Sequence, residues 1–202
     1  MRLDVRRSGA AVTVCGIVLA AGAGTRYGGP KALARNAEGT PWVARAVDTL
    51  VEAGCAPVFV VLGARRDEAT SLVPRVATIV AAPEWADGLS ASVRAGLAAA
   101  SATAARAALV IPVDVPELPA SACARVMAAP TADALRQAVY DGGVGHPALI
   151  GRDHWQPVAA QVSGDRGAGA YLRAHGATPV ECGDLWHGRD VDRAEPQIAS
   201  CQ

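Results

Sequence analysis

The segment VLAAGAGTRYGGPK, residues 18–31, joins an apolar strand to a glycine-rich loop that carries two cations. Because glycine has no Cβ, the four glycines of this loop can adopt positive φ angles and let backbone NH groups approach an anion closely. Arg26 offers a planar fork of donors that matches two phosphate oxygens, and Lys31 adds a compact charge on a flexible stem. The pattern therefore predicts a loop that holds the phosphates of a nucleoside triphosphate.

Two better-known glycine loops differ from this one. A dinucleotide-binding loop needs G-x-G-x-x-G opening straight into a helix, whereas here the spacing is Gly22-x-Gly24-x-x-x-Gly28 and a proline follows closely. This spacing disfavours a hydride-transfer site. A Walker loop needs Lys and then Ser or Thr after its last glycine, but Pro-Lys follows Gly29. The remaining alternative is a plain flexible turn after a buried strand, and two cations in so short a stretch argue against it.

Length, composition and charge indicate a compact domain. The chain has 202 residues, of which 51% are hydrophobic, and this is enough for one sizeable core. We therefore expect residues 1–202 to form a single domain, in which residues 1–10 need not be ordered. The formal net charge at pH 7 is +0 and no Lys/Arg cluster forms a stripe, so nucleic acid is not an expected partner. No uninterrupted apolar segment reaches the roughly 18–20 residues that span a bilayer, and we expect no membrane partner.

Cysteine usage favours a reducing compartment. The five cysteines are widely spaced and form no C-x-x-C pair, which argues against a disulfide framework. The four histidines show no metal-ligand spacing, so a zinc site is not expected. Basic residues ahead of the apolar stretch 10–21 resemble a secretory signal, but cleavage after it would remove the first strand and cut the glycine loop. We therefore expect a cytoplasmic protein.

The first half of the chain alternates strands and helices. Apolar runs of strand length occupy residues 57–63, 77–81 and 107–111 and are typical of strands buried on both faces. Between the strands, helices are expected from Thr40, as N-cap, to a stop at Gly54, and over residues 66–72 and 89–102. This β-α-β-α-β-α-β order predicts an α/β fold with three layers, a mostly parallel sheet and right-handed crossovers.

Regularity weakens after Pro116. We expect a helix near residues 119–127, strands near 136–140 and 147–150, a turn at 141–143, and short helices near His154 and Ala168. No linker long enough to divide domains is present.

Polar side chains follow some of these elements at positions suited to a ligand. In open α/β sheets, ligands sit at the carboxyl ends of the strands, and Asp114 follows the strand at residues 107–111. A carboxylate there could hold Mg²⁺ together with phosphate oxygens, or it could cap a turn. Asp165 could likewise be a site acid or an N-cap. Ser90 and Ser92 lie at a helix start, which could face a ribose or phosphate or simply be capped.

With these residues in place, the chain resembles the molybdopterin nucleotidyltransferases, especially the molybdenum cofactor cytidylyltransferase-like branch. The resemblance runs from Val14 to Asp192. Its most specific block is the loop of residues 19–31, and three further blocks follow in the order of the family. These blocks are W-x-x-G-x-S-x-S-x-x-x-G-L at residues 85–97, D-x-P at residues 114–116, and G-H-P at residues 145–147 with G-D-x-G-A at residues 164–168.

This resemblance implies a Rossmann-like, glycosyltransferase-A-like nucleotidyltransferase fold and a reaction that uses Mg²⁺ and a nucleoside triphosphate. A terminal phosphate of molybdopterin would attack the α-phosphate and expel pyrophosphate, and a molybdoenzyme or its chaperone would receive the product. The implied catalytic residues are Arg26, Lys31 and Asp114, with Asp114 also the metal ligand. The implied acceptor-binding residues are His146 and Asp165. The implied nucleotide-binding residues are Leu19, Ala20, Ala21, Gly22, Ala23, Gly24, Thr25, Gly28, Ser90 and Ser92.

Nucleotide and acceptor choice depend on smaller differences within the family. Cytidylyl members tend to carry Ala-Ala-Gly where guanylyl members carry Ala-Gly-Gly, and the chain has Ala-Ala-Gly at residues 20–22, which favours CTP over GTP. Two departures from the family are Ala82-Pro83 in place of an asparagine and Gly169 in place of an arginine. The alternatives left open are a guanylyltransferase using GTP, a cytidylyltransferase for methylerythritol phosphate or a sugar phosphate, and a non-catalytic nucleotide- or cofactor-binding module.

Overall fold

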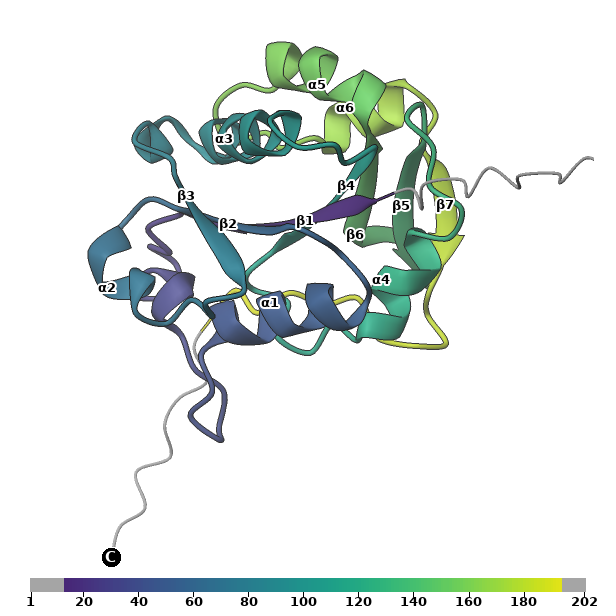
Figure 1. Cartoon of the computed structure of the whole chain (residues 1–202). Helices are drawn as coiled ribbons and strands as arrows, with labels where there is room; N and C mark the ends of the chain where they lie inside the picture. The colour runs from purple at the N-terminus through teal and green to yellow at the C-terminus, as the bar shows by residue number, and fades with distance from the viewer. Residues whose placement is uncertain (1–12, 194–202) are drawn as a thin grey trace, which may run out of the picture.

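A single seven-stranded sheet forms the centre of the computed structural model, which describes residues 13–193 (Figure 1). The sheet has the strand order β3-β2-β1-β4-β6-β5-β7. Parallel pairs join β1 to β2 and β4, β2 to β3, and β5 to β7, whereas β6 runs antiparallel to both of its neighbours. This confirms the mostly parallel α/β sheet expected from the sequence. The strands are β1 (Val14–Ala20), β2 (Val58–Leu62), β3 (Ala77–Ala81), β4 (Ala107–Pro112), β5 (Leu135–Tyr140), β6 (Gly143–Gly151) and β7 (Thr178–Glu181).

Helices cover both faces of the sheet and complete the three layers. One face carries α1 and α4, and the other carries α3, α5 and α6 (Figure 1). No helix among residues 13–193 combines the length and the apolar character that crossing a membrane requires. The expectation for residues 1–10 falls outside the described residues. The helices are α1 (Trp42–Glu52), α2 (Arg66–Thr70), α3 (Leu89–Ser101), α4 (Ala120–Val126), α5 (Trp155–Gln161) and α6 (Gly169–Ala174), with 3₁₀ turns η1 (Lys31–Leu33), η2 (Trp85–Asp87) and η3 (Arg152–His154).

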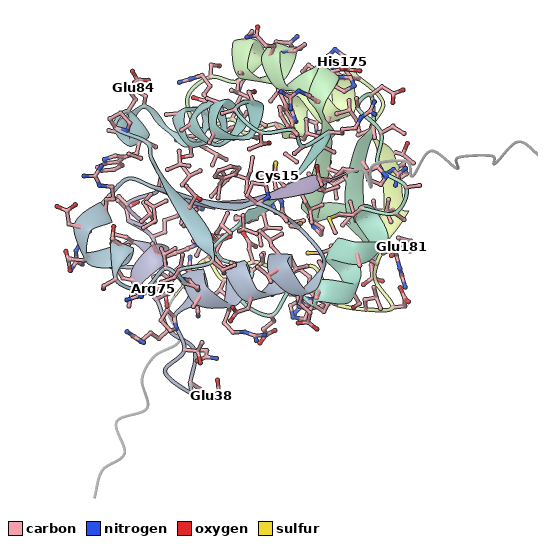
Figure 2. The ribbon with its side chains drawn as sticks, viewed as in Figure 1. Cys15, Glu38, Arg75, Glu84, His175 and Glu181 are labelled. Atoms are coloured by element: carbon pink, nitrogen blue, oxygen red, sulfur yellow. The ribbon has the colours of Figure 1, made fainter. Side chains whose placement is uncertain are left out.

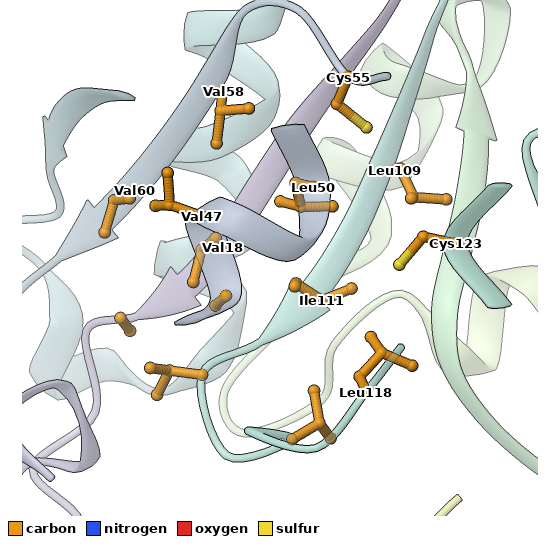
Figure 3. Packing of buried hydrophobic residues seen from close by; sticks show 14 of the residues in the cluster. Val18, Val47, Leu50, Cys55, Val58, Val60, Leu109, Ile111, Leu118 and Cys123 are labelled. Atoms are coloured by element: carbon orange, nitrogen blue, oxygen red, sulfur yellow. The ribbon is translucent and has the colours of Figure 1, made fainter. Parts of the chain in front are cut away.

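The core beneath the site lies between the central strands and α1. Every residue of β1 and β2 is buried, which agrees with the continuous apolar runs that predicted strands covered on both faces. Figure 3 shows Val18 of β1 and Leu109 of β4 among the side chains that surround Leu50 of α1. Because interiors are close-packed, this core fixes where β1 and β4 end.

Two expectations for the elements were wrong. β3 was expected to be buried on both faces, but it is an edge strand, and its Ile79 is 36% exposed. Thr40 was expected to cap α1, but Pro41 occupies the N-cap position and no side chain caps the helix. No strand was predicted at the position of β7. Its four residues form the other edge of the sheet and are almost all exposed, so they show no apolar pattern.

The four cysteines within residues 13–193 are free and buried. Figure 2 shows Cys15 inside the molecule, whereas charged residues such as Glu38 and Arg75 lie at its margin. Burial raises the pKa of the Cys15 thiol to about 12, so this side chain stays protonated and unreactive. These cysteines are therefore small core residues.

The close approach of α3 to the sheet at Gly96 provides a test of this packing. A Cβ at Gly96 would lie 2.8 Å from Ile17 Cγ2 and 3.3 Å from Val61 Cγ2. We expect Gly96→Val to lower the free energy of unfolding by about 1–3 kcal/mol through overpacking. Ala98→Val is the matched control, because Ala98 is exposed on the same helix and should lose only roughly 0.5 kcal/mol in helix propensity. Urea unfolding of both variants measures the difference, and equal losses would contradict this account.

Candidate active site

A cleft of about 610 Å³ opens at the carboxyl ends of β1 and β4. Segments that are far apart in the sequence form its walls: the loop after β1, the start of α3, the end of β4, the start of β6, and residues 190 and 192. Among the site residues predicted from the sequence, Gly28 and Ser90 do not line the cleft. Those that do line it are Leu19, Ala20, Ala21, Gly22, Ala23, Gly24, Thr25, Arg26, Lys31, Ser92, Asp114, His146 and Asp165.

The glycine loop is a tight turn closed on one carbonyl. The backbone NH groups of Tyr27, Gly28 and Gly29 all donate to the Gly24 carbonyl, at 3.0, 3.0 and 3.1 Å. Gly24 has a φ of +61°, and a Cβ there would lie 1.9 Å from the Gly29 carbonyl oxygen, so only glycine fits. The NH groups of Gly28 and Gly29 therefore shape the turn, and the first half of the loop faces the cleft.

Three carboxylates gather opposite this loop. Asp114 follows β4, and Asp190 and Asp192 come from the segment after β7; each can offer one oxygen, and the three oxygens lie within 4.8 Å of one another. Sequence reasoning found Asp114 and missed the other two. Their spacing is the available signal, because residues two apart on an extended segment point to the same side.

Lys31 lies among these carboxylates. Its Nζ donates to Asp114 Oδ2 at 2.8 Å and to Asp192 Oδ1 at 3.2 Å. Although burial alone would lower it, the pKa of Lys31 is raised by hydrogen bonds and charge from Asp114 and Asp192, so the ammonium is retained at neutral pH. The sequence predicted contact between Lys31 and phosphate, and in the structure the Lys31 ammonium is hydrogen-bonded to Asp114 and Asp192.

The charges of the cleft favour a divalent cation. Its lining holds four carboxylates, those of residues 114, 165, 190 and 192, against the two cations Arg26 and Lys31, a formal balance of −2. A polyphosphate would meet repulsion in such a site unless a further positive charge were bound. Asp114 Oδ1 is buried and has no hydrogen-bond partner among the described residues. Carboxylate oxygens are the ligands that Mg²⁺ and Mn²⁺ prefer, so this donor set fits such an ion.

The two predicted acceptor residues line the cleft from different elements. His146 lies at the start of β6, and burial lowers its pKa against the opposing effect of Asp114 and Asp190, which keeps its imidazole neutral. Asp165 is exposed, and its Oδ1 would lie 2.6 Å from a Cβ at Gly88, just before α3. The backbone NH of Ser90 donates to the Gly164 carbonyl at 2.9 Å. Ser90 therefore secures the loop that carries Asp165 instead of facing the cleft.

An aromatic wall was not predicted as part of the site. Trp85 lines the cleft and packs closely on Gly63, where a Cβ would lie 2.5 Å from Trp85 Cβ and 2.7 Å from the Ala21 carbonyl oxygen. Gly63 thus brings the tryptophan beside the end of β1. The residues at the two departures from the family, Ala82, Pro83 and Gly169, lie outside the cleft lining.

Known proteins share this fold. The crystal structure of Rv0371c from Mycobacterium tuberculosis H37Rv superposes with a TM-score of 0.75 at 24% identity, covering 91% of this chain and 95% of that one. A nucleotidyl transferase from Methanothermobacter has a TM-score of 0.70 at 21% identity, with 84% and 87% coverage. A complex of Rv0371c with manganese has a TM-score of 0.65 at 21% identity, with 84% and 86% coverage. At these identities the likeness shows the fold alone.

Sequence comparison goes further than the fold. The MobA-like NTP transferase domain matches residues 16–179, which include the glycine loop, Asp114, His146 and Asp165. A protein from Paenarthrobacter nicotinovorans, named Nicotine blue oxidoreductase, is 35% identical over 195 residues, which are 90% of this chain and 93% of that protein. Since the domain match spans most of the chain and contains the glycine loop and Asp114, the chain belongs to the MobA-like NTP transferase family and is a nucleotidyltransferase.

Proposed function

We propose that this nucleotidyltransferase transfers CMP from CTP to the phosphate of molybdopterin and releases pyrophosphate, with Mg²⁺ as its metal. The observation that carries the proposal is the meeting of the glycine loop, Lys31 and the Asp114 carboxylate in one cleft. Phosphoryl-type transfer needs in-line positioning and charge neutralisation more than covalent help. Arg26 and Lys31 neutralise charge that develops on the pyrophosphate leaving group. Bound Mg²⁺, held by Asp114 with Asp190 and Asp192 beside it, would neutralise phosphate oxygens.

The base pocket supports CTP over GTP on steric grounds. Ala21, the residue after β1, is 2% exposed, and its carbonyl accepts a hydrogen bond from the NH of Ala64 at 2.9 Å, so its backbone is held in place. Trp85 packs on Gly63 and so lies close to the Ala21 backbone. Ala21 and Trp85 both line the cleft, and in this proposal the base lies beside them, where a side chain at position 21 leaves less room for a purine than for a pyrimidine.

The side chains of His146 and Asp165 suit a phosphorylated acceptor with polar ring edges. A neutral His146 can donate one hydrogen bond and accept another, and Asp165 accepts from NH groups. Molybdopterin provides both a phosphate and such ring edges. Methylerythritol phosphate or a sugar phosphate provides fewer NH donors for Asp165. In this proposal the protein acts in the cytoplasm as a single domain, and a molybdoenzyme or its chaperone takes the product.

A release assay tests the reaction. We expect pyrophosphate to appear when Mg²⁺, CTP and molybdopterin are supplied together, and to appear more slowly with GTP. Asp114→Asn keeps the shape of the side chain but removes its charge, and should lower kcat by about 10²–10³. Absence of pyrophosphate with every nucleotide and acceptor, despite tight nucleotide binding, would instead favour the non-catalytic binding module.

The loop gives a second test. Gly24→Ala should weaken CTP binding at least tenfold, because its Cβ would meet the Gly29 carbonyl oxygen at 1.9 Å and open the turn. Gly39→Ala is the matched control, since Gly39 also has a positive φ of +82° but nothing lies within 4 Å of its Cβ position. Isothermal titration with CTP compares the two variants. Equal affinities would mean that the turn does not shape the nucleotide site.

One observation favours a second candidate function. The 35%-identical relative is named an oxidoreductase, so the same cleft could bind a reduced dinucleotide and pass a hydride to a coloured acceptor. The spacing of the glycine loop argues against this, because it lacks the G-x-G-x-x-G form. Following nicotinamide absorbance with a reducible dye separates the candidates. We expect no consumption of NADH or NADPH, and steady consumption without pyrophosphate release would replace the transferase proposal.

A further inference from the structure

The segment after β7 returns across the molecule to the cleft. Figure 1 shows this part of the chain, in yellow, leaving β7 and running past α4 beneath the sheet. We call residues 183–192 the return segment. Its far end is attached at two points, where the Val191 NH donates to the Asp114 carbonyl at 2.9 Å and Asp192 Oδ1 accepts from Lys31 Nζ at 3.2 Å. The segment therefore delivers two of the three clustered carboxylates.

The middle of the return segment packs on the side chain of Tyr140, the last residue of β5. A Cβ at Gly188 would lie 2.5 Å from both Cγ and Cδ2 of Tyr140, and one at Gly145 would lie 2.8 Å from Cδ2. Two glycine backbones thus meet the same edge of the ring. Trp186 packs against Tyr140 with ring centroids 5.4 Å apart and planes at 89°, the edge-to-face geometry that aromatic pairs favour.

The same tyrosine also contacts the segment that carries His146. Its hydroxyl donates to the His146 carbonyl at 2.6 Å, and burial raises the pKa of the Tyr140 phenol, so the hydroxyl remains a donor. Tyr140, Gly145 and Gly188 all lie outside the cleft lining. Each of them nevertheless contacts or belongs to a segment that carries a residue of the cleft.

We propose that Tyr140 and Gly188 are positioning residues for the metal centre, setting where the return segment crosses and thereby how far Asp190 and Asp192 stand from Asp114. This rests on the proposed function in one respect, that a divalent cation binds these carboxylates. Because Asp190 is only two residues beyond Gly188, a shift of the backbone at Gly188 should also move the Asp190 carboxylate. Residues that orient metal ligands commonly contribute about 10- to 100-fold in metal affinity.

Manganese binding to the protein alone tests this without any catalysis. We expect Gly188→Ala to lower Mn²⁺ affinity about tenfold or more, because its methyl group must displace either Tyr140 or the return segment. Gly176→Ala is the matched control: Gly176 also has a positive φ, of +65°, but nothing lies within 4 Å of its Cβ position. Free Mn²⁺ followed by electron paramagnetic resonance gives the affinities, and thermal unfolding confirms that both variants are folded.

A second pair of variants keeps the proposal falsifiable if Gly188→Ala does not fold. Gly145→Ala pushes on the same ring edge and should also weaken Mn²⁺ binding. Tyr140→Phe keeps the ring and should leave Mn²⁺ affinity within about twofold of the wild type. Wild-type affinity in folded Gly188→Ala or Gly145→Ala would overturn the proposal, as would a wild-type protein that binds no Mn²⁺. Wild-type Mn²⁺ binding without pyrophosphate release would refute the proposed function alone.

Discussion

Parallel pairing of β1 with β4 is the constraint on which the site depends. Leu19 is in register with Pro112, so the loop that follows β1 and the acid two residues beyond Pro112 must emerge side by side at one edge of the sheet. The pairing is held by strands buried on both faces and packed by α1 and α3. The glycine-rich turn and a carboxylate thus come together because the core fixes where the two strands end.

Charge compensation follows from that proximity. Asp114 and Lys31 would each be costly to bury alone, and their side chains are only 20% and 14% exposed. Paired at 2.8 Å, they offset each other, while Asp114 Oδ1 remains free to bind a cation. Because Asp192 shares the same ammonium, Lys31 joins the loop, the end of β4 and the return segment into one electrostatic unit.

The sequence predicted the centre of the molecule better than its edges. Continuous apolar runs marked β1, β2 and β4 because burial on both faces leaves a strong compositional signal. β3 had a similar composition but lies at an edge, and β7 is too short and too exposed to show periodicity. In the site, the turn and Asp114 could be recognised from local pattern. Asp190 and Asp192 could not be recognised in this way. They lie in an irregular segment, and only the path of the chain after β7 brings them close to Asp114.

The reversed strand explains how the second half of the chain reaches this edge. Because β6 runs antiparallel to β4 and β5, its beginning, with His146, lies where β4 and β5 end. β5 and β7 are parallel to each other, so Tyr140 at the end of β5 and the start of the return segment also reach this edge. A fully parallel sheet would have placed His146 on the opposite side. The antiparallel β5–β6 hairpin therefore lets Tyr140 contact both the start of β6 and the return segment.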